Sequence, residues 1–122
     1  MSLDKYDLGY LIDIINSIKD IKDFTKNIQY NQYENDRKTK LAVERSIEII
    51  GEAAKSIRET TRNIYKNIDW DAMMKFRNKL VHEYGDIKTE RTWKIAKKTI
   101  IELENELYKI DDLKKYLVKL DI

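Results

Sequence analysis

Apolar residues recur at helical spacing along most of the chain, and few residues interrupt that pattern. The 122 residues include three glycines, far apart in the sequence, and no proline, so little in the sequence breaks helices. The pattern therefore predicts an all-α fold. The length fits one domain spanning residues 1–122, with room for a real core but not for a second domain.

The first predicted helix is marked by a stripe of leucine and isoleucine residues at helical spacing. It extends from about Leu3 to about Ile28, with Ser2 as its N-cap. The polar stretch that follows, residues 29–40, lacks such a stripe. We expect it to hold a turn and then the first turns of the second helix.

The second predicted helix should lie at the centre of the domain, because its apolar positions form a seam in alternating steps of four and three. The seam consists of Val43, Ile47, Ile50, Ala54 and Ile57. Gly51 lies inside this helix, where glycine is less favourable than alanine by about 1 kcal/mol. The close approach of another helix is the simplest compensation, so we expect a helix contact at Gly51.

Two further helices and a short C-terminal one are predicted downstream. Asp69 can cap a third helix that begins at Trp70 and ends near Tyr84, and Thr89 can cap a fourth. Residues 111–122 form an amphipathic pattern that could cover the other helices or bind a partner. The expected architecture is an antiparallel four-helix bundle with a short extra C-terminal helix.

The composition excludes several kinds of chemistry. Cysteine is absent and His82 is the single histidine, which excludes disulfides, thiol catalysis and the usual zinc, copper and haem ligand sets within one chain. A carboxylate site for magnesium or calcium stays open, but no loop is arranged for one, so we expect no metal and no cofactor. The sequence shows neither an apolar run long enough to cross a membrane nor a secretory leader, so we expect a cytoplasmic protein.

The net charge of +2 is too small to indicate a nucleic-acid-binding protein, but the basic residues are unevenly placed. One stretch holds five basic residues with only Glu90 as an acidic neighbour, namely Lys88, Arg91, Lys94, Lys97 and Lys98. Several of the five recur at helical spacing along one side. Such a stripe could contact RNA phosphates, although a solvated helix face is the simpler interpretation of this segment taken alone.

The candidate chemistry lies between Arg77 and Tyr84. Four residues separate Arg77 from His82 and one separates His82 from Tyr84, which gives the pattern R-x4-H-x-Y. Histidine titrates near neutral pH, and arginine is a fixed cation whose shape suits phosphate oxygens. Alone, the histidine would more often stabilise a helix end, the arginine form an ion pair and the tyrosine pack in the core. Together they suggest phosphate chemistry.

The motif and its surroundings resemble the HepT-like branch of the HEPN superfamily. The resemblance includes Gly51-Glu52-Ala53 in the preceding helix and Asp69-Trp70 before the motif helix, and it extends in matching order from about Ala42 to Leu107. It implies a HEPN-type bundle that dimerises at the motif, and a toxin that cleaves RNA. It also implies a nucleotidyltransferase antitoxin that binds the toxin and transfers AMP to Tyr84.

Helical geometry separates the residues of the motif. At about 100° per residue, Arg77 lies in the middle of an apolar arc, and His82 lies about 140° away from it. The arc is formed by Trp70, Met73, Leu80 and Tyr84. An arginine that faces apolar surface needs a partner, and Glu52 is a candidate that would orient it. A symmetric dimer could bring Arg77 and His82 of both chains into one cleft.

These residues suggest metal-independent RNA cleavage. His82 would take the proton from a ribose 2′-hydroxyl, Arg77 would stabilise the phosphate and Asn78 would orient either group. Single-stranded or loop RNA, with transfer RNA as one candidate, allows the necessary in-line attack. The alternative is a catalytically silent helical module that binds and regulates a nucleotidyltransferase. A DNA-binding domain fits less well, because no helix-turn-helix signature is present.

Overall fold

The computed structural model describes residues 3–82 and 86–120, and these residues form helices joined by short turns without any strand. The all-α prediction is therefore confirmed for this part of the chain. The elements are α1 (Lys5–Phe24), α2 (Tyr30–Glu34), α3 (Arg37–Ser56), α4 (Glu59–Ile64), α5 (Trp70–His82), α6 (Asp86–Lys94), the π-helical turn η1 (Ile95–Thr99), α7 (Ile100–Leu107) and α8 (Asp111–Leu120). Within the described ranges no helix is both long and apolar enough to cross a membrane.

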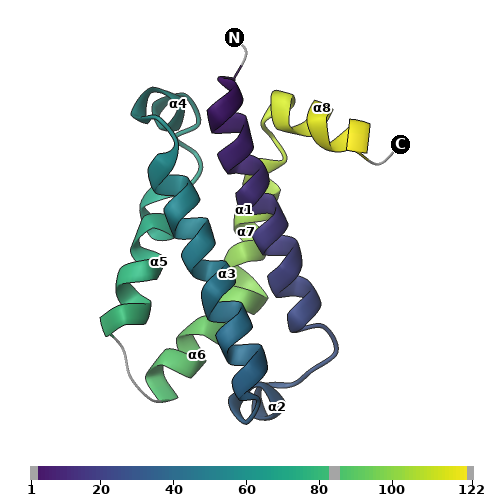
Figure 1. Ribbon diagram of the computed structural model, residues 1–122, viewed down its shortest axis with the longest axis vertical. Helices are drawn as coiled ribbons and strands as arrows, with labels where there is room; N and C mark the ends of the chain where they lie inside the picture. The colour runs from purple at the N-terminus through teal and green to yellow at the C-terminus, as the bar shows by residue number, and fades with distance from the viewer. Residues whose placement is uncertain (1–2, 83–85, 121–122) are drawn as a thin grey trace.

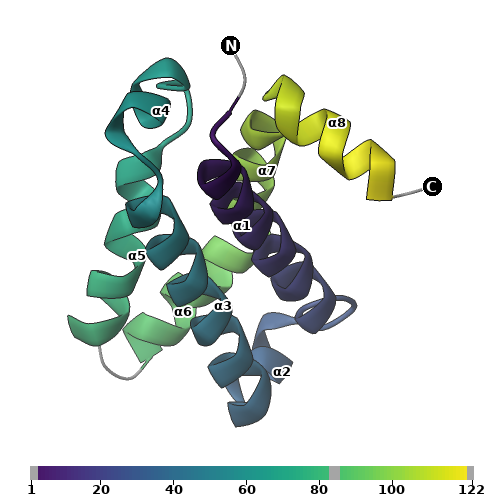
Figure 2. The ribbon, with the colours of Figure 1, turned by 45° about the horizontal axis from the view of Figure 1, so that its top comes forward.

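Four long helical segments alternate in direction, as Figure 1 shows. They are α1, α3, α5 and the continuous run from α6 through η1 to α7. Helix α3 packs against both α1 and α5, and the fourth segment contacts α1 and α3 (Figure 2). These directions agree with the predicted antiparallel packing. The short helices α2 and α4, which connect the long ones, were not predicted.

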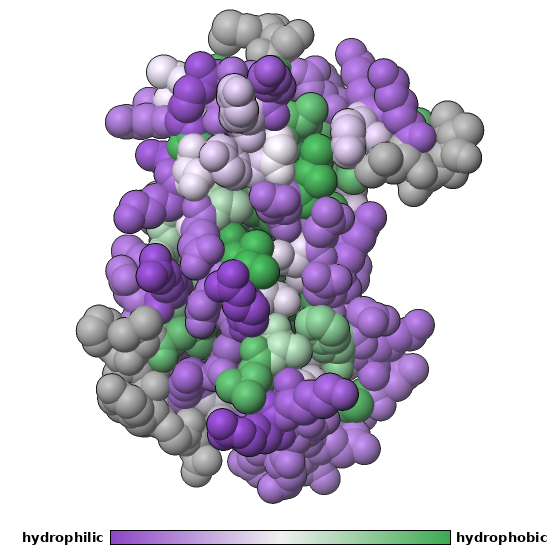
Figure 3. Space-filling view, in the orientation of Figure 1, coloured by the Kyte–Doolittle hydropathy of each residue, from purple (hydrophilic) through white to green (hydrophobic). Residues whose placement is uncertain are grey.

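Helix α3 is the central helix, as its seam predicted. Four seam residues are fully buried and the fifth, Ile57, is 1 % exposed. They pack in one apolar cluster with buried residues of the neighbouring helices. The face of the molecule seen in Figure 3 is mostly hydrophilic, with apolar residues in separate patches. The amphipathic pattern of the sequence therefore corresponds to burial in the folded chain.

Helix α1 begins with a different cap from the predicted one. The Asp4 carboxylate accepts hydrogen bonds from the backbone N–H groups of Tyr6 at 2.8 Å and Asp7 at 3.3 Å. The helix consequently begins at Lys5. Ser2, the predicted cap, lies outside the described residues. A carboxylate suits this position because the N-terminal end of a helix is electropositive.

Helix α1 also ends earlier than predicted, at Phe24 instead of Ile28. Asn27 has a positive φ of 61°, and asparagine tolerates this left-handed conformation better than most residues do. The hydroxyl of Thr25 donates a hydrogen bond to the Ile21 carbonyl at 2.8 Å. The chain thus leaves the helix before its apolar pattern ends.

The predicted start of α5 is confirmed, because the helix begins at Trp70. Asp69 caps it by accepting a hydrogen bond from the Ala72 backbone N–H at 3.0 Å. Residues 83–85, which include the predicted end of this helix at Tyr84, lie outside the described residues. Helix α8 begins at Asp111 as predicted and packs against α1.

The predicted start of the fourth helix at Thr89 is wrong. Helix α6 already begins at Asp86, so Thr89 lies within it, and its carbonyl accepts a hydrogen bond from the Thr92 hydroxyl at 3.1 Å. No proline or glycine after residue 85 prevents the helix from starting there. The turn η1 interrupts the same helix with one wider turn, which shifts the register of the residues that follow.

A buried carboxylate joins α1 to the corner between α3 and α4. Asp7, which is 1 % exposed, accepts hydrogen bonds from the Thr61 hydroxyl at 2.6 Å and from the backbone N–H and Nε of Arg58 at 3.2 and 3.0 Å. Burial raises the pKa of this carboxyl group, but the hydrogen bonds from Thr61 and Arg58 outweigh it, so the pKa lies below its ordinary value. Asp7 is therefore held in its charged form.

The substitution Asp7→Asn should lower the free energy of unfolding at neutral pH by about 1–3 kcal/mol, because Arg58 and Thr61 lose a charged acceptor. The lowered pKa stabilises the fold above the unfolded value of about 3.9, and this contribution is lost as the pH falls through the folded value. The difference in the free energy of unfolding between wild type and variant, measured by urea unfolding, should therefore become smaller in acid.

The matched control is Asp13→Asn, which removes an exposed carboxylate from the same helix. It should change the free energy of unfolding by less than about 0.5 kcal/mol. Equal effects of the two substitutions at neutral pH would contradict a stabilising role for the Asp7 hydrogen bonds.

Candidate active site

Helices α3 and α5 come into close contact at Gly51. A Cβ atom at this position would lie 2.9 Å from the Met73 carbonyl oxygen and 3.8 Å from the Arg77 Cβ. The predicted close approach of another helix is therefore confirmed. Because Gly51 carries no side chain, the base of Arg77 lies directly beside the backbone of α3.

The structure corrects the expectation that Arg77 faces apolar surface, because this side chain is exposed. The buried residues around it on α5 are Met73, Phe76 and Leu80. Phe76, which the predicted arc left out, moves the centre of the buried face away from Arg77. The arginine therefore lies at the margin of the helix contact, where Gly51 has no side chain to cover it.

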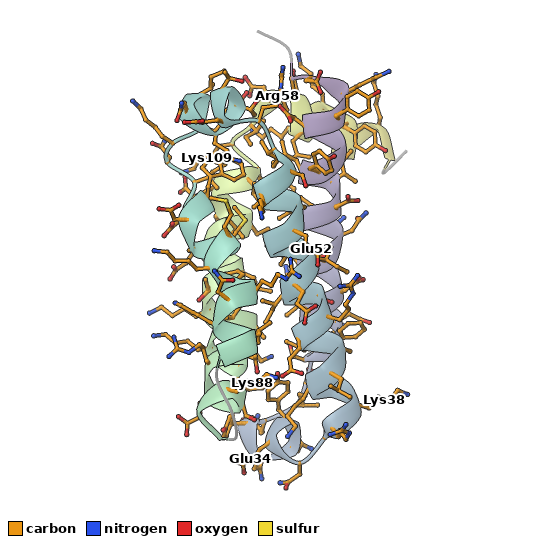
Figure 4. The ribbon with its side chains drawn as sticks, turned by 60° about the vertical axis from the view of Figure 1, so that its left-hand side comes forward. Glu34, Lys38, Glu52, Arg58, Lys88 and Lys109 are labelled. Atoms are coloured by element: carbon orange, nitrogen blue, oxygen red, sulfur yellow. The ribbon has the colours of Figure 1, made fainter. Side chains whose placement is uncertain are left out.

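A cleft of about 450 Å³ opens between α3 and α5 beside this contact. Its lining consists of Gly51, Glu52, Lys55, Ser56, Met74, Arg77 and Asn78. The cleft thus brings together three predicted site residues, Arg77, Asn78 and Glu52, from two helices. Figure 4 shows Glu52 on the C-terminal half of α3, with α5 alongside.

Glu52 has a different ionic partner from the expected one. Its carboxylate lies 3.7 Å from Nη1 of Arg45, which is also 3.4 Å from the carboxylate of Glu48. Among the described residues, no ion pair joins Glu52 to Arg77. Glu52 therefore lines the same cleft as Arg77, but no ion pair between the two supports its predicted orienting role.

The structure gives less information on the end of the motif. His82 is the last residue of α5, five residues beyond Arg77 and so about 7.5 Å farther along the helix axis. Only its place in the helix is described, and Tyr84 lies outside the described residues. The meeting of Arg77 and His82 in one cleft therefore stays a prediction.

The predicted basic stripe is partly used for packing. Lys88 forms an ion pair with Glu44 on α3, with 2.9 Å between Nζ and Oε1 (Figure 4). Lys97 donates a hydrogen bond to the Thr25 carbonyl at 2.7 Å, and its Nζ lies 5.0 Å from the centre of the Trp93 ring. Both lysines therefore join α6 and η1 to neighbouring elements.

The other three residues of the stripe differ in their exposure to solvent. Arg91 is half-buried, whereas Lys94 and Lys98 are exposed. The turn η1 lies between Lys94 and the helix that follows, so the spacing of the stripe departs from that of a regular helix. The contact of these residues with RNA stays a prediction, and Lys94 and Lys98 suit it best.

Larger hollows occur around α4, away from the motif. One of about 660 Å³ lies among the start of α1, α4 and α8, and another of about 570 Å³ lies between α4 and the start of α5. Neither is lined by a motif residue. The smaller cleft is the better candidate site, because it combines the exposed Arg77 with Asn78.

Sequence reasoning missed three residues that line the cleft, Lys55, Ser56 and Met74. Lys55 follows Gly51 by four residues, which places it on the same side of α3 one turn later. Met74 precedes Asn78 by four residues on α5 and follows the same rule. The spacing from Gly51 and Asn78 could have identified Lys55 and Met74.

Comparison with known proteins identifies the family of the chain. Residues 14–110 match the family model described as ribonuclease HepT-like. The chain belongs to this HepT-like ribonuclease family, as the resemblance of its motif predicted.

Several relatives share most of their length with the chain. It is 38 % identical over 105 residues to a "Putative RNase" of Methanocaldococcus jannaschii, covering 86 % of this chain and 84 % of that protein. It is 37 % identical over 101 residues to the "Probable ribonuclease HepT" of Thermococcus cleftensis, covering 83 % of this chain and 92 % of that protein. No solved structure is significantly similar to the chain.

The contact at Gly51 can be tested by Gly51→Ala. The added Cβ would lie too close to the backbone carbonyl of Met73, so α3 and α5 must separate. We expect a loss of about 1–3 kcal/mol in the free energy of unfolding, measured by urea unfolding.

Gly9→Ala is the control, because a Cβ on Gly9 in α1 would meet nothing within 4 Å apart from its chain neighbours and the backbone of its own helix. This substitution should stabilise the helix by about 0.5–1 kcal/mol. If both alanine variants stabilise the protein, α3 and α5 do not depend on close contact at Gly51.

Proposed function

We propose that the protein is an endoribonuclease toxin with its active site at the cleft between α3 and α5. The observation that carries this proposal is the exposed Arg77 at that cleft, in the family's motif and beside Asn78. Membership in the HepT-like ribonuclease family supports RNA as the substrate. An exposed guanidinium is available to a phosphate and does not have to break an ion pair with a described residue first.

The proposed reaction uses the RNA's own 2′-hydroxyl as the nucleophile. His82 takes the proton from this hydroxyl, and the oxygen then bonds to the adjacent phosphorus. Arg77 donates hydrogen bonds to the phosphate oxygens as negative charge builds on them. The bond to the 5′-oxygen breaks, and that oxygen gains a proton. The products carry a 2′,3′-cyclic phosphate and a 5′-hydroxyl.

Asn78 is proposed to orient His82 or the phosphate from the same cleft. The amide side chain both donates and accepts hydrogen bonds, so it can serve either group. Glu52 is proposed to help position Arg77, with a smaller effect on the cleavage rate than Asn78 has. The reaction requires no metal ion, because the nucleophile belongs to the substrate and Arg77 supplies positive charge.

A homodimer is part of the proposal. Cleavage needs both a base and an acid, and each chain supplies one histidine. A second chain across the cleft would supply the other histidine. The exposure of Arg77 supports this arrangement, because its guanidinium lies at the surface, where another chain and the RNA can reach it.

Single-stranded or loop RNA in the cytoplasm is the proposed substrate, since in-line attack needs backbone freedom that a duplex lacks. Transfer RNA offers such loops. The exposed Lys94 and Lys98 are proposed to contact phosphates away from the cleft, with Lys88 and Arg91 as weaker candidates.

Control by a nucleotidyltransferase antitoxin completes the proposal. The antitoxin would bind the toxin and transfer AMP to the Tyr84 hydroxyl. The attached AMP would add bulk and negative charge two residues from His82, and so repel RNA phosphate. Tyr84 would therefore act as a switch and not as a catalyst.

The catalytic assignment predicts that His82→Ala and Arg77→Ala each lower the rate of RNA cleavage at least about 100-fold. The measurement is growth and RNA integrity after induction in cells, followed by cleavage with purified protein. Lys79→Ala, which removes an exposed cation from the opposite side of α5, is the control and should cleave at the wild-type rate. Cleavage by His82→Ala at the wild-type rate would contradict the catalytic role of His82. An absence of cleavage by purified wild type would instead favour a silent module that binds a nucleotidyltransferase.

The proposed transfer of AMP to Tyr84 predicts the behaviour of Tyr84→Phe. This variant should remain toxic but should gain no AMP when it is produced together with the antitoxin, as measured by intact-protein mass spectrometry and growth. If the antitoxin silences Tyr84→Phe as fully as wild type, binding alone controls the toxin.

A further inference from the structure

The cleft beside Arg77 contains a second cation that the motif does not include. Lys55 is exposed on α3 and lines the same cleft. Neither Lys55 nor Arg77 forms an ion pair with another described residue. The one carboxylate that lines the cleft, Glu52, has Arg45 at 3.7 Å. The two cations are therefore available to an anion that enters the cleft.

The antiparallel helices set the order of these groups along the cleft. Gly51 lies beside Arg77. Lys55 lies one turn farther along α3, about 6 Å from Gly51 along the helix axis. This direction leads toward the N-terminal end of α5, because the two helices run in opposite directions (Figure 1). His82 lies in the other direction from Arg77. Arg77 is thus placed between Lys55 and His82.

The other cleft residues near Lys55 are less suited to hold a phosphate. The Ser56 hydroxyl donates a hydrogen bond to the Glu52 carbonyl at 3.0 Å, so its hydrogen is already used within α3. Met74 is half-buried on α5 and presents a thioether and methylene groups. Lys55 is therefore the group at this end of the cleft that can attract a second negative charge.

We propose that Lys55 binds the RNA phosphate next to the scissile one, on the side of Arg77 that is away from His82. The inference rests on the proposed function and adds a substrate-binding residue to it. Arg77 holds the scissile phosphate, and Lys55 fixes the neighbouring one as a point charge. A single strand lying along α3 and α5 thereby contacts both helices. Met74 offers an apolar surface to the nucleotide that joins the two phosphates.

The direct test measures RNA binding in the His82→Ala background, so that the strand is not cut. The probe is a fluorescently labelled single-stranded RNA of mixed sequence. Lys55→Ala should weaken binding about three- to tenfold. It should also reduce the slope of log affinity against log salt by about 0.7, the value for one lost phosphate contact on a single strand. Lys55→Arg keeps the charge and should preserve the slope.

The control is Lys38→Ala, which removes the same charge from an exposed position near the other end of α3 (Figure 4). It should leave the salt slope unchanged. In a chain with an intact His82, Lys55→Ala should raise the KM for cleavage while kcat stays near the wild-type value, because Lys55 does not touch the reacting atoms.

Two results would overturn the inference. One is a salt slope for Lys55→Ala equal to that of Lys38→Ala, and the other is the absence of RNA binding by the His82→Ala parent. Failure of the proposed function has a different signature, since His82→Ala would then cleave RNA as wild type does. Loss of cleavage in His82→Ala with no effect of Lys55→Ala would leave the ribonuclease proposal intact and remove only this contact.

Discussion

The close contact between Gly51 and the backbone of Met73 is the constraint on which the arrangement of the site depends. It lets α5 approach the central helix α3 so closely that a Cβ would be only 2.9 Å from a carbonyl oxygen. The buried seam of α3 holds the rest of the domain around this contact. Because Gly51 has no side chain that could cover Arg77, the arginine stays exposed at the edge of the contact between α3 and α5. A tightly packed core thus presents a cation to solvent without burying its charge.

Much of the fold could be predicted from the sequence, because burial follows the apolar pattern of the long helices. The seam of α3 and the start of α5 at Asp69 are examples. The predictions were wrong at helix ends and at one helix turn, where the local backbone conformation sets the boundaries. The positive φ of Asn27 ends α1 early, and η1 widens a helix turn without any sequence signal that we recognised. The predicted cap at Thr89 failed because residues before it were already able to form a helix.

The motif predicts roles for Arg77 and His82, but it does not predict the surface around them. Periodicity within one helix cannot show what the facing helix contributes. The predicted arc of α5 placed Arg77 against apolar surface because it left out the buried Phe76. Lys55 was missed because its relevance comes from sharing a cleft with Arg77 of another helix, and only its spacing from Gly51 could have suggested it.

The most direct test of the proposed reaction is the chemistry of the RNA ends that the purified protein produces in the presence of a metal chelator. The account predicts cleavage that leaves a 2′,3′-cyclic phosphate and a 5′-hydroxyl. It also predicts that a strand with a 2′-deoxyribose at the cleavage position stays intact. Cleavage of that deoxy strand, or products with 5′-phosphates, would show that the 2′-hydroxyl is not the nucleophile and would contradict the account.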